Sequence, residues 1–422
     1  MKIWILNHYA TRTPENGGGG RHYYLARELV KKGYEVMIIA SGFSHYDYEE
    51  TQQYNKKGFS TNNVGGINYC WIKTFPYNSN SWRRIVNMLS YASKLYLVGK
   101  NFERPDLIIA SSMHPFTWIS GYLLARRFDC RFVSEVRDLW PETAIQYDYF
   151  KRNSIPAIML NQLEKFIYYR SEKIIVLLPG AIHYISDQGI SSEKVVYLPN
   201  GADEELYNFD SEEDEHLFNE YVKRYPVLLD KRKFKILYTG SHGLVNILDL
   251  LLSAAKLISE QKMHDIHFIL IGTGSEKDRL IETAKTMNLD NVSFADPVPR
   301  AVIPYILNRC ADLCIELMPD ISLYSKFGVS PNKLFDYIAS GKPIIMVGNP
   351  FDNLVLKANG GVVVKSEKPE DLASAIMQCS QMDKAVLADM GNRGRQYFQQ
   401  HHTYKSLADK LEQKIIKSGE DI

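Results

Sequence analysis

The sequence has few cysteines, and their spacing excludes most metal-binding roles. The 422 residues include five of them, Cys70, Cys130, Cys310, Cys314 and Cys379. None forms a CxxC pair, and no further His or Cys pair accompanies Cys310 and Cys314 at the spacing of a zinc site. We therefore predict buried free thiols, no metal site and a reducing compartment.

A charge imbalance and a long apolar run are also missing. The formal net charge is +1, which argues against a general nucleic-acid-binding protein. No stretch reaches the roughly 18 apolar residues that a membrane-spanning helix needs. The opening segment MKIWILNHYATRTPE has only a short apolar run and no small-residue cleavage site, so it is a poor signal peptide. We expect a cytoplasmic protein, either free or peripheral on the inner membrane face.

What the sequence does contain is an alternation of apolar strands and helical segments. A first series runs from KIWILN through DLIIAS and CRFVSEV to KVVYLPNG, and a second runs from FKILYTGS to GGVVVKS. Continuous apolar strands that alternate with helices indicate parallel sheets covered on both faces. A chain of this length is also too long for one core. The expected fold class is therefore α/β, with two doubly wound, Rossmann-like domains.

The domain boundary is predicted in the acidic, turn-rich segment ADEELYNFDSEEDEH, which we interpret as a linker. The alternative is a solvated surface helix and loop. We predict one domain over 1–204, a second over 205–395 and a terminal helical segment over 396–422. Because open α/β sheets bind ligands at the carboxyl ends of their strands, we expect the site in a cleft lined by loops of both domains.

A glycine-rich loop, NGGGGRHYY, follows the first strand and opens the first helix. Gly18, Gly19 and Gly20 let the backbone approach a ligand, and the free amides of a helix start attract anions. We predict contact with a phosphate or with the acceptor, against the alternative of a flexible loop. The loop is not a GxGxxG fingerprint, and no acid ends the second strand, so NAD binding is disfavoured.

The segment GVSPNKLFDY carries the strongest prediction of a ligand site. Pro331 suits an early helix position, where its missing N–H loses little. The amides around Asn332 and Lys333 would then point at a diphosphate, and Lys333 adds a positive charge. Asp336, one turn further on, would accept both hydroxyls of a ribose. The alternative is an ordinary surface helix with a Lys–Asp pair.

A second glycine-containing turn, in ILYTGSHGLVN, follows the first strand of the second domain. His242 either faces a phosphate there or simply sits in the turn. The predicted donor-binding residues are Gly240, His242, Ser330, Asn332, Lys333 and Asp336.

Two side chains of the first domain are candidate catalytic residues, because each directly follows a strand. His114 lies in SSMHPF, and Asp138 lies in EVRDLWPET. His114 either stabilises a reacting sugar hydroxyl or is a turn histidine. Asp138 either receives the proton of an acceptor hydroxyl or holds its loop.

Residues 82–100 predict a basic amphipathic helix. One helical face is apolar, with Ile85, Met88, Leu89, Ala92, Leu95 and Tyr96. The basic residues are Arg83, Arg84, Lys94 and Lys100, and no acid interrupts them. Such a helix can lie on an anionic membrane. The alternative is a core helix with a solvated back.

Taken together, these motifs resemble those of family 4 glycosyltransferases with the GT-B fold, over essentially the whole chain. The resemblance rests on GGGGRHYYLARELVKKGYEV, VRDLWPE, LPNGAD, YTGSHG, LIGTGSEKDRL, NVSF and SPNKLFDYIASGKPII. The combination of VRDLWPE with SPNKLFDYIASGKP is similar to the transferases of amino sugars, including fucosamine transferases of capsule and O-antigen assembly.

The resemblance implies a nucleotide-sugar donor bound by the second domain and an acceptor bound by the first. It also implies retention of the anomeric configuration, no required metal or other cofactor, and a terminal helix that crosses back to the first domain. We expect the protein to transfer an N-acetylated sugar from a UDP-sugar to a lipid-linked saccharide in bacterial surface polysaccharide assembly. The alternatives are a UDP-sugar 2-epimerase of the same architecture and a non-catalytic nucleotide-sugar-binding partner subunit.

Three departures from the family pattern qualify this expectation. Of two glutamates separated by seven residues, only the second has a match, Asp336, and Gly328 stands at the first. The Arg and Lys after the first strand of the second domain are also unmatched. Ser241 and Asn246 stand near those positions, so Lys333 would carry more of the diphosphate charge. Arg137 replaces the His that often precedes the Asp of VRD, which leaves sugar contact to His114 or to backbone.

Overall fold

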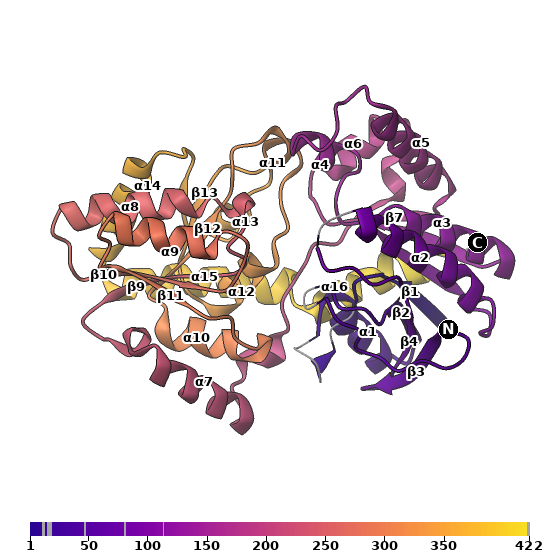
Figure 1. The fold of residues 1–422 in the computed structure, drawn as a ribbon, viewed down its shortest axis with the longest axis horizontal. Helices are drawn as coiled ribbons and strands as arrows, with labels where there is room; N and C mark the ends of the chain where they lie inside the picture. The colour runs from indigo at the N-terminus through magenta and orange to yellow at the C-terminus, as the bar shows by residue number, and fades with distance from the viewer. Residues whose placement is uncertain (11–12, 15–18, 46–47, 80–81, 113, 420–422) are drawn as a thin grey trace. The chain divides into compact units, whose positions relative to one another are not determined.

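In the computed structural model, the described residues are 1–10, 13–14, 19–45, 48–79, 82–112 and 114–419. The chain divides into two compact units (Figure 1). The N-terminal unit comprises Met1–Pro199 and Leu407–Ile422, and the C-terminal unit comprises Asn200–Ser406. The boundaries predicted from the sequence are 204/205 and 395/396.

The N-terminal unit is built on an eight-stranded sheet of order β3-β4-β2-β1-β5-β6-β7-β8. Its strands are β1 (Lys2–Leu6), β2 (Glu35–Ser41), β3 (Phe59–Val64), β4 (Ile67–Ile72), β5 (Leu107–Ser112), β6 (Arg131–Val136), β7 (Lys173–Val176) and β8 (Val195–Tyr197). All neighbours pair in parallel except β3 and β4. This hairpin, whose two-residue turn is Gly65-Gly66 with both residues at positive φ, was not predicted from the sequence.

The helices of this unit cover both faces of the sheet. They are α1 (Arg21–Lys31), α2 (Trp82–Gly99), α3 (Phe116–Phe128), α4 (Glu142–Gln146), α5 (Ile155–Arg170) and α6 (Ala181–Ser186). Strands β5, β6 and β7 succeed one another on one side of β1, whereas β2 lies on the other side. Because crossovers between parallel strands are right-handed, α2, α3 and α5 cover one face and α1 covers the opposite one.

The end of the chain returns to the N-terminal unit, as the resemblance implied. Helix α16 (Tyr404–Leu411) continues through Glu412–Ile416 as a wider helical turn. Lys32 donates to Glu412 at 2.7 Å, and Arg131 donates to the carbonyl of Ile416 at 2.7 Å. These contacts hold the terminal segment against α1 and β6.

The C-terminal unit has a six-stranded parallel sheet of order β11-β10-β9-β12-β13-β14. Its strands are β9 (Phe234–Thr239), β10 (Ile266–Ile271), β11 (Val292–Ala295), β12 (Leu313–Leu317), β13 (Ile344–Val347) and β14 (Gly361–Val364). Its helices are α7 (Glu212–Arg224), α8 (Leu248–Glu260), α9 (Lys277–Thr286), α10 (Ile303–Cys310), α11 (Ser322–Phe327), α12 (Asn332–Ser340), α13 (Leu354–Lys357), α14 (Pro369–Ser380) and α15 (Lys384–His401). One buried cluster joins the sheet to α7, α10 and α12, and another joins it to α8, α9 and α14. The predicted doubly wound class is therefore confirmed.

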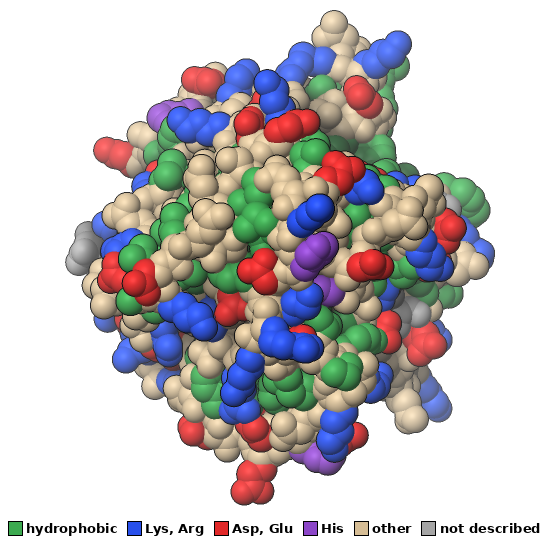
Figure 2. Space-filling view, turned by 90° about the vertical axis from the view of Figure 1, so that its left-hand side faces the viewer, with side chains coloured by type: hydrophobic (Ala, Val, Ile, Leu, Met, Phe, Trp, Pro, Cys, Tyr) green, Lys and Arg blue, Asp and Glu red, His purple; other side chains and the backbone are tan. Residues whose placement is uncertain are grey.

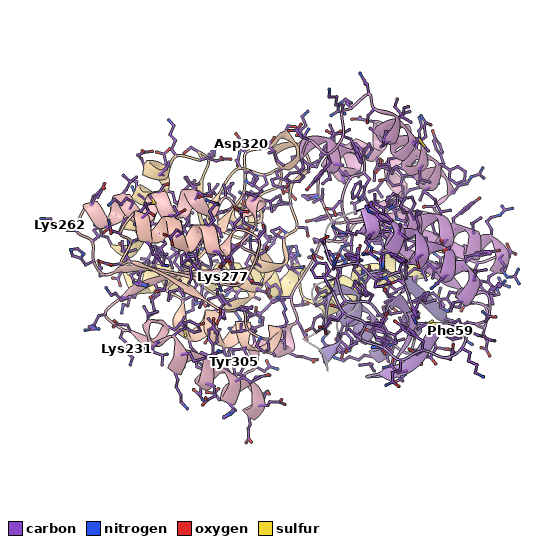
Figure 3. All side chains as sticks on the ribbon, in the orientation of Figure 1. Phe59, Lys231, Lys262, Lys277, Tyr305 and Asp320 are labelled. Carbon is purple, nitrogen blue, oxygen red and sulfur yellow. The ribbon has the colours of Figure 1, made fainter. Side chains whose placement is uncertain are left out.

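The interpretation of the acidic segment as a linker is wrong. Glu204–Tyr207 forms a short 3-10 helix, and α7 begins at Glu212. The Ser211 hydroxyl accepts from the amide of Asp214, and the acids of the first turn favour a helix start. Tyr305, labelled in Figure 3, donates to the carbonyl of Ser211 at 3.2 Å. The acidic residues are thus the solvated side of a packed helix, which was the alternative interpretation.

The helix predicted over residues 82–100 forms as α2, but its predicted apolar face is only partly buried. In α2, Ala92 and Leu95 are buried, whereas Ile85 and Leu89 are exposed. The helix therefore has one apolar side packed on the unit and a second apolar side in contact with solvent.

The thiols are all free, as predicted, and four of the five are buried. Burial raises the pKa of Cys310 to about 11 and that of Cys314 to about 12, which keeps both thiols protonated. No cluster of metal-ligating side chains occurs among the described residues. No helix in the described ranges is long and apolar enough to span a bilayer. Figure 2 shows basic and acidic side chains interspersed over one face of the molecule, as the small net charge leads us to expect.

Candidate functional site

The start of α12 has free amides directed away from the helix. Pro331, predicted at an early helix position, occupies the N-cap in extended backbone, and the helix begins at Asn332. The amides of Asn332 and Lys333 are the first two of the helix, so neither has a carbonyl partner within it. Four of the next five positions carry buried apolar or aromatic side chains, which fix the helix against the sheet: Leu334, Phe335, Tyr337 and Ile338.

The ammonium group of Lys333 is held by three side chains. Its Nζ lies 3.3 Å from Oε1 of Glu316, and it donates to Oδ1 of Asn246 at 2.6 Å and to the Tyr238 hydroxyl at 3.3 Å. Glu316 is the penultimate residue of β12 and is 1% exposed. Burial raises the pKa of Glu316, and the charge of Lys333 opposes this rise. The result is a positive charge with a fixed position beside the free amides.

These bonds connect α12 to the loop after β9. In this loop the Arg and Lys that the family 4 resemblance leads us to expect are absent. Asn246 donates from Nδ2 to the carbonyl of Ser241 at 2.9 Å while it accepts from Lys333. A Cβ at Gly240 would lie 3.2 Å from Cδ of Lys333. Lys333 thus reaches the loop that contains Ser241 and Asn246. Its role in binding a diphosphate stays a prediction.

His242 is fully buried in the same loop. Its ring contacts the rings of Tyr238 and Phe294, each with centroids 6.0 Å apart. Burial lowers the pKa of His242 to about 4, so the ring is neutral near pH 7. Neither ring nitrogen has a hydrogen-bond partner among the described residues. A bound ligand would supply the partner that a buried imidazole needs.

Asp336 has a basic partner that the sequence analysis missed. Both oxygens of its carboxylate accept from Arg300, with Oδ1 2.6 Å from Nη2. Asp336 is 4% exposed; burial raises its pKa, and the guanidinium of Arg300 opposes this rise. Each carboxylate oxygen keeps a further lone pair. The predicted ribose contact is therefore chemically compatible with the ion pair and stays a prediction.

Ser330 fixes the loop that leads into α12. Its hydroxyl accepts from the amide of Asn200 at 2.9 Å, and its carbonyl accepts from the Asn200 side chain at 2.7 Å. The structure therefore gives Ser330 a positioning role, and direct contact with a donor stays a prediction.

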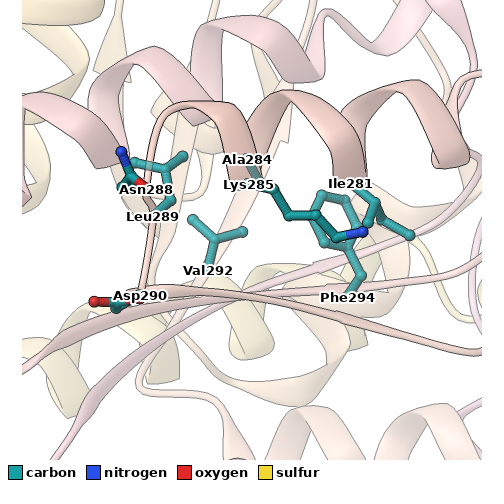
Figure 4. Close-up of a pocket in the computed structure, with 8 residues that line it drawn as sticks. All are labelled: Ile281, Ala284, Lys285, Asn288, Leu289, Asp290, Val292 and Phe294. Carbon is teal, nitrogen blue, oxygen red and sulfur yellow. The ribbon is translucent and has the colours of Figure 1, made fainter.

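A cavity of about 380 Å³ lies between α9 and β11 in the same unit (Figure 4). Its lining residues are Ile281, Ala284, Lys285, Asn288, Leu289, Asp290, Val292 and Phe294. None of the predicted donor residues belongs to this lining, although Phe294 also contacts the ring of His242. Lys277, labelled in Figure 3, donates to the carbonyl of Gly272 at 3.0 Å and to Asp296 at 3.1 Å.

In the N-terminal unit, His114 and Asp138 follow neighbouring strands. Ser112 at the end of β5 pairs with Val136 at the end of β6, so both candidates lie at the same edge of the sheet. No hydrogen bond joins the two within the described part of the chain. Asp138 is half-buried; burial raises its pKa and Arg137 opposes the rise. A raised pKa brings a carboxylate closer to the basicity that proton transfer requires.

His114 is paired with a histidine that the sequence analysis did not select. Its Nε2 lies 2.7 Å from Nδ1 of His8, and the His8 ring is stacked 4.4 Å from Tyr9 and 4.4 Å from Tyr91. Burial lowers the pKa of His114 to about 3, so it is neutral. Its Nδ1 has no partner among the described residues, which leaves this nitrogen available to a ligand.

The glycine-rich loop is described only in part, because Gly18 lies outside the described residues. Gly19 is required by packing, since a Cβ there would collide with the ring of Tyr23. Gly20 is the N-cap of α1, and a Cβ at this position would meet nothing within 4 Å. Open space therefore adjoins the start of α1, and the predicted phosphate or acceptor contact stays a prediction.

A buried ionic network that the sequence analysis missed supports the start of α1. Arg21 donates from Nε to Oε1 of Glu135 at 3.0 Å, and Nε2 of His22 lies 2.7 Å from Oε2. Arg21 also donates to the carbonyl of Leu198 at 2.8 Å. Although burial acts to raise it, Arg21 and the hydrogen bond with His22 hold the pKa of Glu135 well below its ordinary value. The glutamate within the apolar strand CRFVSEV was the available sequence signal.

Glu164 on α5 is a second buried carboxyl, and its partners in the described part are uncharged. It accepts from the hydroxyls of Tyr168 at 2.5 Å and Tyr184 at 2.8 Å, and from Gln188 at 3.3 Å. Burial raises its pKa from 4.5 to about 7. Its partner Tyr184 lines a cavity of about 240 Å³, together with Pro141, Glu142, Ile145, Arg152, Ala157, Ile158, Asn161 and Gln162.

This raised pKa predicts a pH-dependent stability. Between pH 4.5 and 7 the folded protein keeps a proton on Glu164 that the unfolded chain has lost, so stability falls as pH rises through this window. The loss is about 3 kcal/mol at most, from about 1.4 kcal/mol per pKa unit. Glu164→Gln should flatten this slope, as measured by denaturant unfolding at both ends of the window. Equal slopes for the wild-type protein and the variant would contradict the prediction.

Two family models match the chain in succession. Residues 16–206 match Glycosyltransferase Family 4, and residues 222–397 match Glycosyl transferases group 1. A probable glycosyltransferase, WbjE of Pseudomonas aeruginosa, is 23% identical over 310 residues, which cover 72% of this chain and 73% of that protein.

Solved structures of glycosyltransferases share the fold. Anabaena Alr3699/HepE in complex with UDP-glucose has a TM-score of 0.66 at 15% identity, with 100% of both chains covered. WaaG, a glycosyltransferase involved in lipopolysaccharide biosynthesis, has a TM-score of 0.63 at 13% identity, with 98% of this chain and 99% of that chain covered. With both family models matched in order on two Rossmann-like units, the chain is a glycosyltransferase of the family 4 type, with the GT-B fold.

Proposed function

We propose that this glycosyltransferase transfers an N-acetylated sugar, with retention, from a UDP-sugar to a lipid-linked saccharide in bacterial surface polysaccharide assembly. The proposal includes no required metal and a location at the inner membrane face. It is supported by the UDP-glucose complex of Alr3699/HepE and by the role of WaaG in lipopolysaccharide biosynthesis. The observation that carries it is the fixed ammonium of Lys333 beside the free amides of α12.

The donor part of this proposal depends on charge. Breaking the bond between the sugar carbon and the diphosphate oxygen leaves the bonding electrons on UDP, so negative charge develops at the phosphate. Lys333 and the first amides of α12 would stabilise that charge from preorganised positions. His242 would donate or accept one further hydrogen bond, and Asp336 would orient the ribose.

The acceptor part assigns two roles in the N-terminal unit. The acceptor hydroxyl oxygen forms the new bond to the sugar carbon, and Asp138 would take its proton. His114 would contact a sugar hydroxyl through Nδ1, in the orientation that its bond with His8 sets. Gly19 and Gly20 would contact a phosphate or the acceptor.

A nucleotide-sugar screen tests the proposal. UDP and UDP-N-acetylhexosamines should raise the melting temperature, because ligand at 100 times its Kd adds about 2.7 kcal/mol of stability. UDP should also be released slowly in water, with and without EDTA, and NMR of the glycoside product should show the donor's anomeric configuration. Absence of stabilisation by any nucleotide sugar would contradict it.

The same screen separates the alternative functions. A 2-epimerase would return an isomeric sugar that is still attached to UDP. A non-catalytic partner subunit would be stabilised by the donor without releasing UDP in the presence of any acceptor. Loss of activity on EDTA treatment, with recovery on addition of a divalent cation, would contradict the metal-independent part alone.

A further inference from the structure

The outer sides of α2, α3 and α5 carry an unusual share of the exposed apolar residues. Ten of the twenty large apolar side chains that are exposed in the described part of the chain lie on these three helices. They are Trp82, Ile85, Leu89, Leu97, Leu123, Ile155, Ile158, Met159, Phe166 and Tyr169, each between 45 and 74% exposed. Single exposed apolar residues are ordinary, but a contiguous group marks an interaction surface.

The group is contiguous because the three helices pack side by side (Figure 1). Ser120 of α3 donates to the carbonyl of Ala92 in α2 at 2.7 Å. The rings of Tyr122 in α3 and Phe166 in α5 lie 5.6 Å apart. All three helices cover the same face of the sheet, so their outer sides form one surface. We call it the α2–α3–α5 face.

Each stripe follows the period of its helix. On α5 the exposed apolar residues Ile155, Met159, Phe166 and Tyr169 recur at steps that keep them on one side. On α2 the exposed residues Trp82, Ile85 and Leu89 do the same. The buried sides of both helices are already packed on the unit, so a second apolar stripe has no role in the fold of the isolated unit.

The charges of the α2–α3–α5 face have one sign. The three helices contain seven basic residues. Arg84 donates to the Tyr9 hydroxyl and Lys94 donates to the carbonyl of Lys73. The basic residues left for the outer surface are Arg83, Arg126, Arg127, Lys165 and Arg170. The one acid of the three helices, Glu164, is fully buried and faces away from solvent. Basic side chains around an apolar surface can keep their charges at lipid headgroups while their stems lie on the apolar layer.

We propose that the α2–α3–α5 face binds the protein to an anionic lipid bilayer. The charge pattern favours a bilayer over a second copy of the chain. In a two-fold dimer the same patch would face itself, and its basic groups would meet without an exposed acid from these helices to pair with. An anionic headgroup layer supplies the opposite charge, and the apolar stripes supply insertion.

The α2–α3–α5 face also indicates how a lipid-linked acceptor would be presented, an inference that rests on the proposed function. Ile158 belongs to the exposed stripe of α5 and to the lining of the cavity beside Glu142, Arg152 and Tyr184. A lipid-linked acceptor held in the bilayer at α5 would therefore present its saccharide next to a polar cavity.

Vesicle flotation tests the proposal with the full chain. Wild-type protein should float with phosphatidylcholine vesicles that contain phosphatidylglycerol and should float poorly without it. Ile155→Glu/Met159→Glu should lower the partition coefficient at least about tenfold, since each substitution places a charge in the apolar layer. Arg126→Glu/Arg127→Glu should lower it to a similar extent by charge reversal. Both pairs are surface changes, so melting temperatures should stay near that of the wild type.

The matched control is Leu356→Glu/Val386→Glu, which adds the same charge at similarly exposed apolar positions of the C-terminal unit. It should float like the wild type. Unchanged flotation of both face variants would overturn the proposal. It would also be overturned if the wild-type protein did not bind vesicles but formed a dimer in light scattering that the face substitutions dissociate. UDP release from a UDP-sugar in water is measured in parallel. If the wild-type protein released no UDP, the proposed function would fail, whereas the membrane proposal would still be decided by flotation.

Discussion

Replacing Lys333 with methionine is expected to lower kcat by about 10² to 10³-fold, the usual effect of removing one preorganised group that faces developing charge. Glu316, Asn246 and Tyr238 hold the Lys333 ammonium in place, so its charge is preorganised, and the substitution removes this charge entirely. Steady-state assay of UDP release with saturating donor measures the effect. Lys256→Ala on α8, which removes a surface ion pair with Glu260, is the matched control and should leave kcat unchanged.

The same substitution should also destabilise the protein, because it leaves the carboxylate of Glu316 buried and without its cation. Removing one partner of a buried pair costs about 3 kcal/mol or more. Lys333→Met/Glu316→Gln should recover much of this stability while kcat stays low. Recovery of both stability and kcat in the double variant would show that Lys333 has only a structural role.

Replacing Asp336 with asparagine is expected to remove the enzyme's preference for a ribose over a dideoxyribose. The wild-type protein should bind UDP at least about tenfold more tightly than 2′,3′-dideoxy-UDP, because hydrogen bonds to a charged group contribute about 1.5–3 kcal/mol each. The variant should bind both nucleotides with similar affinity. Isothermal titration calorimetry measures the two Kd values in each protein.

This comparison separates nucleotide binding from folding. Asp336→Asn leaves Arg300 without its bidentate partner, so some loss of stability is expected whether or not Asp336 binds a ribose. The ratio of the two Kd values is insensitive to that loss. Asp230→Asn removes a solvent-exposed pair with Arg232 in the same unit and should keep the wild-type ratio. A wild-type ratio in Asp336→Asn would contradict the ribose assignment.

The fold could be predicted from the sequence because parallel strands buried on both faces read as continuous apolar runs. Segments such as DLIIAS and FKILYTGS have this property. The β3–β4 hairpin was missed because β3 lies at the edge of the sheet and carries polar residues such as Asn62 and Asn63. The segment 202–216 was wrongly interpreted because its acids suggested a solvated linker, whereas Tyr207 within it and Phe218 just beyond it are buried.

The site could be predicted only as far as local sequence determines it. The start of α12 could be predicted from local sequence, because a proline precedes a short amphipathic helix. The partners of its charged residues come from distant segments. Glu316 and Arg300 reach Lys333 and Asp336 only after the strands have paired. His8 likewise meets His114 across 106 positions of sequence. A charged residue inside an apolar strand, such as Glu316, was the signal that the sequence offered.

A structure of the UDP complex tests the central claim most directly. The diphosphate should lie at the start of α12, with phosphate oxygens within about 3 Å of the Lys333 ammonium and of the amides of Asn332 and Lys333. The ribose hydroxyls should contact Asp336. Diphosphate density at any other position in the C-terminal unit, with the Lys333 ammonium still bound only to Glu316 and Asn246, would contradict the account.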